Sequence, residues 1–192
     1  MDVLRELQGQ RTLMLPCRID EKIATDLRYR LLELSLESDE EIRLVIDSDG
    51  GYSEPSLSIT DMIASITAPV IGIVIGKCYS MAVVILQACR KRLALQHAMF
   101  LLHFINTEVE FSFHLSEQEI RALFERRYLE GQDAQRKSEH LIAARTGKPV
   151  HEIRDLMHTG DSLRVRLNAE EAASIGLIDE IIPDPKGLFK KQ

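Results

Sequence analysis

Apolar residues recur along this chain with two alternating periods. Over residues 21–36 they lie three or four positions apart, as on one face of a helix, and Asp20 is placed to cap that helix. Over residues 42–46 and 70–75 they form short continuous runs, which are typical of strands buried on both faces. Because such strands alternate with helices, the pattern predicts an α/β fold with a parallel sheet and helices on its faces.

The remaining segments continue the same alternation. Asp and Gly residues over 47–51 give a strong turn signal, and Ser116 with Glu119 forms a capping box before a long charged helix. Residues 106–114 alternate polar and apolar side chains over part of their length, which predicts a half-exposed hairpin or arm. The further predicted elements are helices over 55–66, 81–88 and 116–147, one through 157 that ends near 160, one over 168–176, and strands over 92–96, 99–104 and 177–182.

No repeat, low-complexity tract or linker divides the chain. Its 192 residues therefore predict a single domain over 1–192, long enough to bury a real core. Within that domain we expect a short N-terminal segment of about residues 1–10, and an arm with its long helix over about 104–147.

Composition excludes several classes of protein. A net charge of −6 and a pI near 5.6 argue against a nucleic-acid partner. Cys17, Cys78 and Cys89 show no C-x-x-C spacing, which favours reduced thiols, and no apolar export signal opens the chain. The apolar stretch over 68–88 is interrupted by glycines and Lys77, as a strand followed by a helix would be. We expect a soluble cytoplasmic protein with no membrane partner, no cofactor and no metal.

Ser80 is the first candidate for chemistry. It lies between an apolar strand-like run and an apolar helix-like run, so its hydroxyl is expected at a helix N-terminus. Unpaired backbone N–H groups and the positive end of the helix dipole gather there, which suits a nucleophile whose reaction develops negative charge. A buried small residue or a simple N-cap is the other interpretation of Ser80.

Two other features end neighbouring strands. Gly51 follows one apolar strand and His103 ends another, and the carboxyl ends of parallel strands share one edge of a sheet. A serine nucleophile needs a base such as His103, and a developing oxyanion needs backbone N–H donors such as those of Gly51 and Met81. A glycine turn and a strand-end histidine without a catalytic role remain alternatives for these positions.

The ordered set of motifs resembles the proteolytic subunit of the Clp protease. The spacing of Gly51 and Ser80 is similar to that between the family's Gly-Gly loop and its catalytic serine. The matching motifs are Arg11-Thr12-Leu13-Met14-Leu15, Ile19-Asp20-Glu21, Gly50-Gly51, Gly76-x-x-x-Ser80-Met81, Met99-Phe100-Leu101-Leu102-His103, Asn168-Ala169-Glu170-Glu171-Ala172 and Gly176-Leu177-Ile178-Asp179.

The resemblance implies the fold of the ClpP/crotonase superfamily, with repeated ββα units around a parallel sheet plus a handle made of the arm and the long helix. It implies a serine endopeptidase that cleaves unfolded polypeptides or peptides inside a chamber of heptameric or stacked double rings. Ser80 would be the nucleophile, His103 the general base, and the N–H groups of Gly51 and Met81 the oxyanion hole. An AAA+ unfoldase is an implied partner, although few residues precede Arg11.

The position of the third member of the implied triad depends on which neighbouring motif is used for the alignment. Counting back from Asn168, the family's aspartate falls at Arg164, whereas counting forward from residue 153 it falls near residue 160. Asp161 is the nearest carboxylate and the first candidate, Asp155 is the second, and absence of a third member is the remaining alternative. A carboxylate in this role orients the histidine and stabilises its charged form.

Several departures from the family keep other functions open. Asp47-Ser48-Asp49 stands where the family has Asn-Ser-Pro, Ala82 replaces a glycine, and Phe104-Ile105 stands where the family has Gln-Pro. These changes favour a second hypothesis, a catalytically inactive regulatory or structural ring subunit. A crotonase-type acyl-CoA enzyme, which shares the superfamily fold and its paired N–H donors, is the third.

Overall fold

Strands and helices alternate along the chain, as the apolar periodicity predicts. The structure, a computed structural model, describes residues 11–107, 109–110, 112–159, 164–186 and 188–189. Its elements are β1 (Thr12–Ile19), α2 (Glu21–Glu37), β2 (Ile42–Gly51), α3 (Ser53–Ser65), β3 (Val70–Tyr79), α4 (Met81–Ala88), β4 (Lys91–Leu95), β5 (Met99–His103), α5 (Glu117–Thr146), α6 (Val150–Thr159), β6 (Arg164–Asn168), α7 (Ala169–Ser174) and β7 (Glu180–Ile182).

The strands form one seven-stranded sheet in which β3 is the branching strand. The main path runs β1-β2-β3-β4-β7, all parallel. The first half of β3 pairs with β4, whereas its last residues pair with β5, which in turn pairs antiparallel with β6. The predicted α/β class with a mostly parallel sheet is confirmed.

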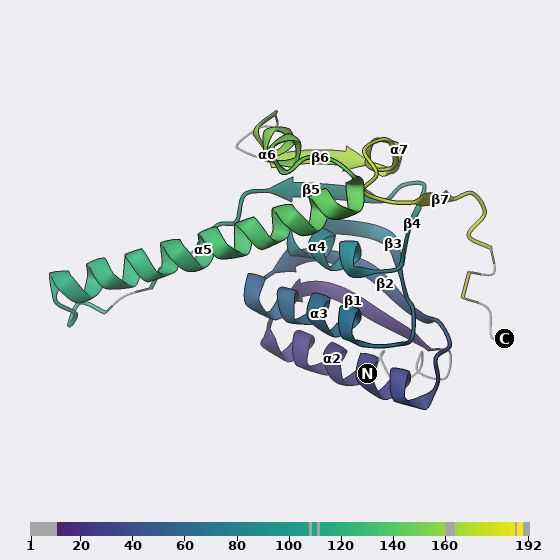
Figure 1. Ribbon diagram of the computed structural model, residues 1–192, viewed down its shortest axis with the longest axis horizontal. Helices are drawn as coiled ribbons and strands as arrows, with labels where there is room; N and C mark the ends of the chain where they lie inside the picture. Colours follow the sequence, from purple (N-terminus) through teal and green to yellow (C-terminus); the bar gives the residue numbers. More distant parts are fainter. Residues whose placement is uncertain (1–10, 108, 111, 160–163, 187, 190–192) are drawn as a thin grey trace.

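Helices α2, α3, α4 and α5 form a connected layer along the sheet. Figure 1 shows α2, α3 and α4 lying along the strands, while α5 continues far beyond the edge of the sheet. Helix α4 is buried over nearly its whole length, so it is the centre of the core between the sheet and the other helices. The start of α4 is therefore fixed by packing against the sheet and the neighbouring helices.

The predicted helix ends are observed. The Asp20 carboxylate accepts the N–H of Ile23 at 2.8 Å and caps α2, and Ser116 with Glu119 forms the capping box of α5. Gly147 ends α5 in the left-handed conformation, with a φ of 70°. Local capping chemistry thus places these helices where the sequence predicts them.

The turn predicted over residues 47–51 is wrong, because this segment remains in β2. Gly50 and Gly51 pair with Arg18 and Ile19 of β1, and Ser48 pairs with Cys78 of β3. The pairing register shifts on both sides of β2 near these polar residues, so the strand continues through them. A segment rich in Asp and Gly can stay in a strand when both neighbouring strands satisfy its backbone.

Two strands have no counterpart in the predicted pattern. β1 precedes the first predicted helix, and β6 is a polar strand that, within the described residues, pairs with β5 alone. The final strand is also shorter than predicted, since β7 covers Glu180–Ile182 only. Short strands at the margin of a sheet carry little hydrophobic signal, so tertiary pairing decides them.

The segment between β5 and α5 is predicted as a half-exposed hairpin or arm, and its described residues do not form a hairpin. Among its described residues, 104–107, 109–110 and 112–116, none is in a strand. The Phe113 side chain is 96% exposed. Its alternating pattern therefore has no partner strand among the described residues.

The two cysteines whose side chains the structure describes are buried and unpaired, as the sequence predicts. Cys78 and Cys89 are free thiols, and burial raises the pKa of Cys89 to about 12 and that of Cys78 well above its usual value.

No helix in the described part of the chain is both long and apolar enough to cross a membrane.

A buried arginine joins β4 and α4 to the loop before β7. The Arg92 side chain on β4 donates to both carboxylate oxygens of Asp179, to Gln87 Oε1 at 2.7 Å and to the carbonyl of Gly176 at 2.9 Å. Burial alone would raise the pKa of Asp179, but hydrogen bonds from Arg92 outweigh it and hold that pKa below 3.8. The interaction therefore fixes the loop before β7 against the sheet.

Asp179→Ala should destabilise the fold strongly, because it leaves the buried Arg92 guanidinium without its carboxylate. We expect a loss of about 3 kcal/mol in the free energy of unfolding at pH 7, measured by denaturant titration. Because the pKa of Asp179 is lowered on folding, the wild-type advantage is full above its ordinary pKa of 3.8 and is lost as the pH falls through the folded value.

The adjacent Glu180→Ala is the matched control for this change. It removes only the half-exposed ion pair between Lys91 and Glu180, which is screened by solvent and should cost far less than the change at Asp179. Equal losses in the two variants would contradict the assignment of Arg92 as the buried anchor.

Candidate active site

Ser80 occupies a strained turn between β3 and α4. Its φ of 54° lies in a region that non-glycine residues rarely adopt, at a cost of about 1–3 kcal/mol. Its N–H donates to the carbonyl of Leu101 at 2.7 Å and its carbonyl accepts the N–H of Val83 at 3.0 Å. The Ser80 side chain makes no capping hydrogen bond. The turn therefore presents a half-buried hydroxyl that the helix does not use, and the simple N-cap interpretation fails.

The Gly50–Gly51 segment packs directly against this turn. Gly50 has a φ of 84°, and a Cβ there would lie 2.6 Å from the Tyr79 carbonyl oxygen and 2.7 Å from the Ser80 Cβ. A Cβ on Gly51 would lie 2.0 Å from the carbonyl oxygen of Ile19. Both positions require glycine, because the Gly50 backbone lies against the Ser80 turn and the Gly51 backbone lies against Ile19 of β1.

Met81 is the first residue of α4, so its N–H has no acceptor within the helix. A Cβ on Gly50 would lie 3.0 Å from that nitrogen. The backbone of Gly50 and the start of α4 thus converge beside Ser80, and Gly51 is the next residue of β2. An oxyanion needs a pair of backbone N–H donors, and these two segments are the ones that could supply it.

His103 ends β5, the strand beside Ser80. Tyr79 and Leu101 are paired in the β3–β5 register, so Ser80 and His103 follow the carboxyl ends of adjacent parallel strands. His103 Nδ1 is hydrogen-bonded to the carbonyl oxygen of Phe104 at 2.5 Å. Because a carbonyl only accepts, Nδ1 carries the proton and Nε2 of the neutral ring is left as the basic nitrogen.

No hydrogen bond joins Ser80 to His103 in the described part of the chain. In a protein without substrate, catalytic hydrogen bonds are often long and tighten only on binding, so this observation does not separate the two residues functionally. The structure brings the two residues to the same edge of the sheet but does not pair them.

The structure does not bring a carboxylate to His103 among the residues that it describes. Asp161 lies outside the described residues. Asp155 is exposed on α6 and makes no hydrogen bond with His103. In the antiparallel β5–β6 register, His103 is paired with Arg164. Directly paired residues have side chains on the same face, so a guanidinium stands where the family register would put the aspartate.

The two aspartates near the glycines are both bonded to Lys77. The Lys77 N–H donates to Asp47 Oδ1 at 2.8 Å, and its Nζ donates to Asp49 Oδ1 and Oδ2 at 2.7 and 2.8 Å. The hydrogen bond with Asp49 raises the pKa of Lys77. Lys77 thus links β2 to β3 three residues before Ser80 and compensates the negative charge beside Gly50. Sequence reasoning missed this role, although Lys77 interrupts an otherwise apolar run.

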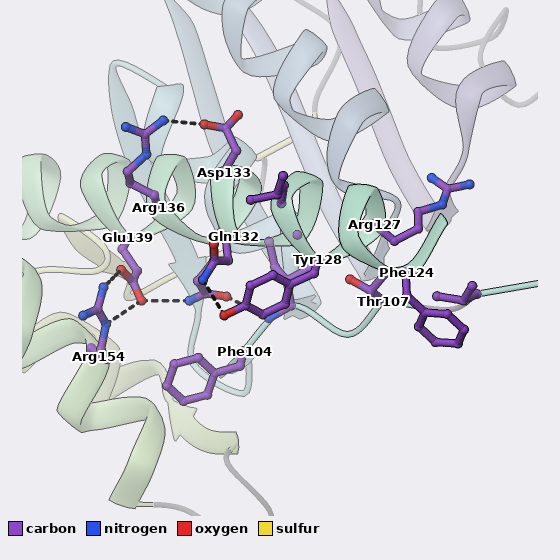
Figure 2. Close-up of a pocket in the computed structure, with 15 residues that line it drawn as sticks. Phe104, Thr107, Phe124, Arg127, Tyr128, Gln132, Asp133, Arg136, Glu139 and Arg154 are labelled. Carbon is purple, nitrogen blue, oxygen red and sulfur yellow. Dashed lines mark hydrogen bonds and ion pairs between the residues drawn. The ribbon is translucent and has the colours of Figure 1, made fainter. Parts of the chain in front are cut away.

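A groove of about 870 Å³ opens beside Phe104, the residue that follows His103. It lies between α5 and the segment after β5, and Phe104, Phe124 and Tyr128 contribute aromatic side chains to it. In Figure 2, Glu139 and Arg154 face one another at one end of this groove, near Phe104. No cluster of metal-binding side chains is present among the residues that the structure describes.

Comparisons with known proteins agree on one family. A sequence model of the Clp protease family matches residues 1–185. The chain is 31% identical over 189 residues to the ATP-dependent Clp protease proteolytic subunit 3 of Streptomyces avermitilis, covering 97% of this chain and 80% of that protein. It is 30% identical over 195 residues to the proteolytic subunit 2 of Chlamydia muridarum, covering 97% and 87%.

Gly50→Ala should destabilise the protein more than a change of backbone conformation alone would. The control is Gly147→Ala, which has a similar φ of 70° but no atom within 4 Å of the added Cβ. We expect about 1–2 kcal/mol of destabilisation at Gly147 and about 1–3 kcal/mol more at Gly50, because its Cβ meets the Ser80 turn. Denaturant unfolding at one fixed protein concentration measures both, and equal losses would contradict the contact.

Proposed function

The chain belongs to the Clp protease family, and we propose that it is a serine endopeptidase of the Clp type that cleaves unfolded polypeptides or peptides. The observation that carries this proposal is the strained Ser80 turn, which packs against Gly50 and starts a buried helix beside the strand that ends in His103. A merely structural serine has no need of a positive φ or of a hydroxyl left unused by the helix. The family membership inferred from the motifs is confirmed, and the roles of the individual residues are the proposal.

In the proposed mechanism, His103 Nε2 removes the proton from Ser80 Oγ as that oxygen bonds to the scissile carbonyl carbon. The N–H groups of Gly51 and Met81 donate to the carbonyl oxygen as it becomes an oxyanion. Collapse of this intermediate breaks the C–N bond, and His103 gives its proton to the leaving amine. Water then attacks the acyl-Ser80 ester with His103 again as base, which releases the acid and restores Ser80.

Asp161 remains the carboxylate that the sequence predicts beside His103, with Asp155 as the second candidate. In this role a carboxylate would bond Nδ1 of His103 and hold the tautomer described above. The same nitrogen is bonded to the carbonyl of Phe104, which supports the required tautomer without a carboxylate in contact.

A single domain over residues 1–192 is proposed to assemble into heptameric or stacked double rings in the cytoplasm, with an AAA+ unfoldase as a partner. Support comes from α5, which projects beyond the sheet (Figure 1), and from large exposed apolar side chains on or near it. These residues are Phe113, Phe124, Tyr128 and Leu129. Isolated soluble domains rarely expose so many apolar groups in one region.

The second candidate function is an inactive ring subunit. Arg164, not a carboxylate, is paired with His103, and no hydrogen bond links His103 to Ser80 in the described structure. The pairing with Arg164 favours a site that has lost its reaction, whereas the absent hydrogen bond is compatible with either function. Retention of the strained Ser80 turn, which costs free energy in the folded state, favours activity instead.

Fluorophosphonate labelling distinguishes these two functions. We expect one covalent adduct on the purified wild-type assembly, read by intact mass, because an activated serine attacks the phosphorus and displaces fluoride. Ser80→Ala should form no adduct while keeping its fold and assembly. An unlabelled wild-type protein that is folded and assembled would support the inactive subunit and contradict the proposed peptidase.

Lys77→Met should slow the same labelling reaction. The variant leaves the Asp49 carboxylate uncompensated beside Gly50, where negative charge opposes formation of the oxyanion. We expect a rate about tenfold lower at low salt, with a smaller difference at high salt.

Two further variants test the cause of this effect. Lys91→Met removes a comparable half-exposed ion pair on β4 and should label at the wild-type rate. Combining Lys77→Met with Asp49→Asn should restore the rate, since it removes the charge itself. A wild-type rate in Lys77→Met alone would show that Asp49 does not affect the oxyanion.

A further inference from the structure

We propose that Gln135 and Glu139 of α5 are positioning residues that orient His103 through the Phe104–Ile105 peptide group. The inference rests on the proposed function, because it assigns His103 its orienting partners in that reaction. It follows from a continuous series of hydrogen bonds that begins at the imidazole and ends at a buried carboxylate.

The first step lies within the chain next to the histidine. His103 Nδ1 donates to the carbonyl oxygen of Phe104. The N–H of Ile105 belongs to the same peptide group, and it donates to Gln135 Oε1 at 2.8 Å. A peptide group bonded at both ends is polarised by each bond, so the two interactions strengthen one another.

The second step fixes the orientation of the Gln135 amide. Its oxygen must face the Ile105 N–H, and its Nε2 donates to Glu139 Oε1 at 2.9 Å. A flipped amide would place N–H against N–H and oxygen against carboxylate, so only one orientation satisfies both neighbours. Gln135 also fixes the position of the backbone that follows His103.

The third step supplies the charge. The Glu139 side chain is 0% exposed, and the Arg154 guanidinium on α6 donates to its two oxygens at 3.1 and 2.6 Å. Burial alone would raise the pKa of Glu139, but hydrogen bonds from Arg154 and Gln135 outweigh it and lower that pKa below its usual value. Glu139 is therefore an anion at neutral pH. Figure 2 shows the Glu139–Arg154 contact between α5 and α6.

All three N–H groups point the same way along this series. Each donor, from His103 through Ile105 and Gln135, faces an acceptor one step nearer to the Glu139 carboxylate. A series with one direction that ends in an anion favours positive charge at its beginning, where the imidazolium forms during the reaction. Its effect is weaker than that of a carboxylate in direct contact, because two neutral amide groups intervene.

In this chain the side chain at the position paired with His103 is not a hydrogen-bond acceptor, and the series of hydrogen bonds that ends on α5 supplies one. The position paired with His103 is Arg164, which cannot accept a hydrogen bond. In the part of the chain that the structure describes, no carboxylate bonds to His103 directly. The series ending at Glu139 instead favours the Nδ1–H tautomer of His103 and supplies a negative charge, and it does so through the peptide group that follows His103.

The test compares four variants on α5 with the wild-type protein. Gln135→Leu breaks the series, and Glu139→Gln keeps an acceptor but removes its charge. The double variant Gln135→Glu with Glu139→Gln moves the carboxylate one step nearer to His103. Gln132→Leu is the matched control, because its Nε2 bonds only Tyr128 Oη on the exposed side of the same helix.

Two readouts are measured on assembled protein. Magic-angle-spinning NMR of protein labelled with ¹⁵N-histidine reports which ring nitrogen of His103 carries the proton, and His103→Gln identifies its signals among the 6 histidines. Peptide hydrolysis gives kcat and KM separately. The NMR readout does not need an active enzyme, so failure of the proposed peptidase would leave this inference testable.

We expect Nδ1–H in the wild type and a mixture of tautomers in Gln135→Leu. For Gln135→Leu, kcat should fall about tenfold to a hundredfold with little change in KM, well short of the roughly 10⁴-fold loss for a directly bonded carboxylate. Glu139→Gln should lose less than Gln135→Leu, and the double variant should recover activity. Gln132→Leu should match the wild type in both measurements.

Three results would overturn the inference. One is a wild-type His103 protonated at Nε2. Another is a folded Gln135→Leu with the wild-type tautomer and kcat. The third is Asp161→Asn changing the tautomer while Gln135→Leu does not, which would assign the orienting role to Asp161 instead.

Discussion

The fold keeps Ser80 in a backbone conformation that it would not adopt alone. Its N–H is held by the carbonyl of Leu101 on β5, its carbonyl by the N–H of Val83 in α4, and its other side is closed by Gly50. These three contacts come from three different elements. The parallel sheet, the buried helix and the branching of β3 are all needed to bring them together, so the site depends on the whole fold and not on one loop.

Charge around this turn is arranged in bonded pairs. The Lys77 ammonium is paired with Asp49 beside the glycines, the Lys77 backbone N–H donates to Asp47, and Arg154 is paired with Glu139 near the segment that follows His103. Asp49 and Glu139 thus each have a cation in contact, and each contact joins two elements of the chain. Electrostatics and position are coupled, since removing either partner would both free a charge and loosen a connection near the turn.

Sequence alone could predict the helices, because caps such as Asp20 and Ser116 act within a few residues. It could also place Ser80 and His103 at one edge, since the carboxyl ends of parallel strands share that edge. It could not predict that residues 47–51 stay in β2, nor the bond between Ile105 and Gln135, which joins residues 30 positions apart. Such features arise only when distant elements pack, and no local pattern encodes them.

The unpaired edges of the sheet limit how copies of this chain can associate. In the described structure, β1, β6 and β7 each pair with one neighbour only. β1 carries a register shift beside Pro16 and an exposed Arg18, β6 carries exposed arginines, and β7 has 3 residues. Proline, bulges, charge and shortness all discourage a second chain from extending a sheet. Uncontrolled growth by strand addition is therefore disfavoured at these three edges in the described structure, so the proposed assembly would have to use side-chain contacts, such as those of the projecting α5, and not continuation of the sheet.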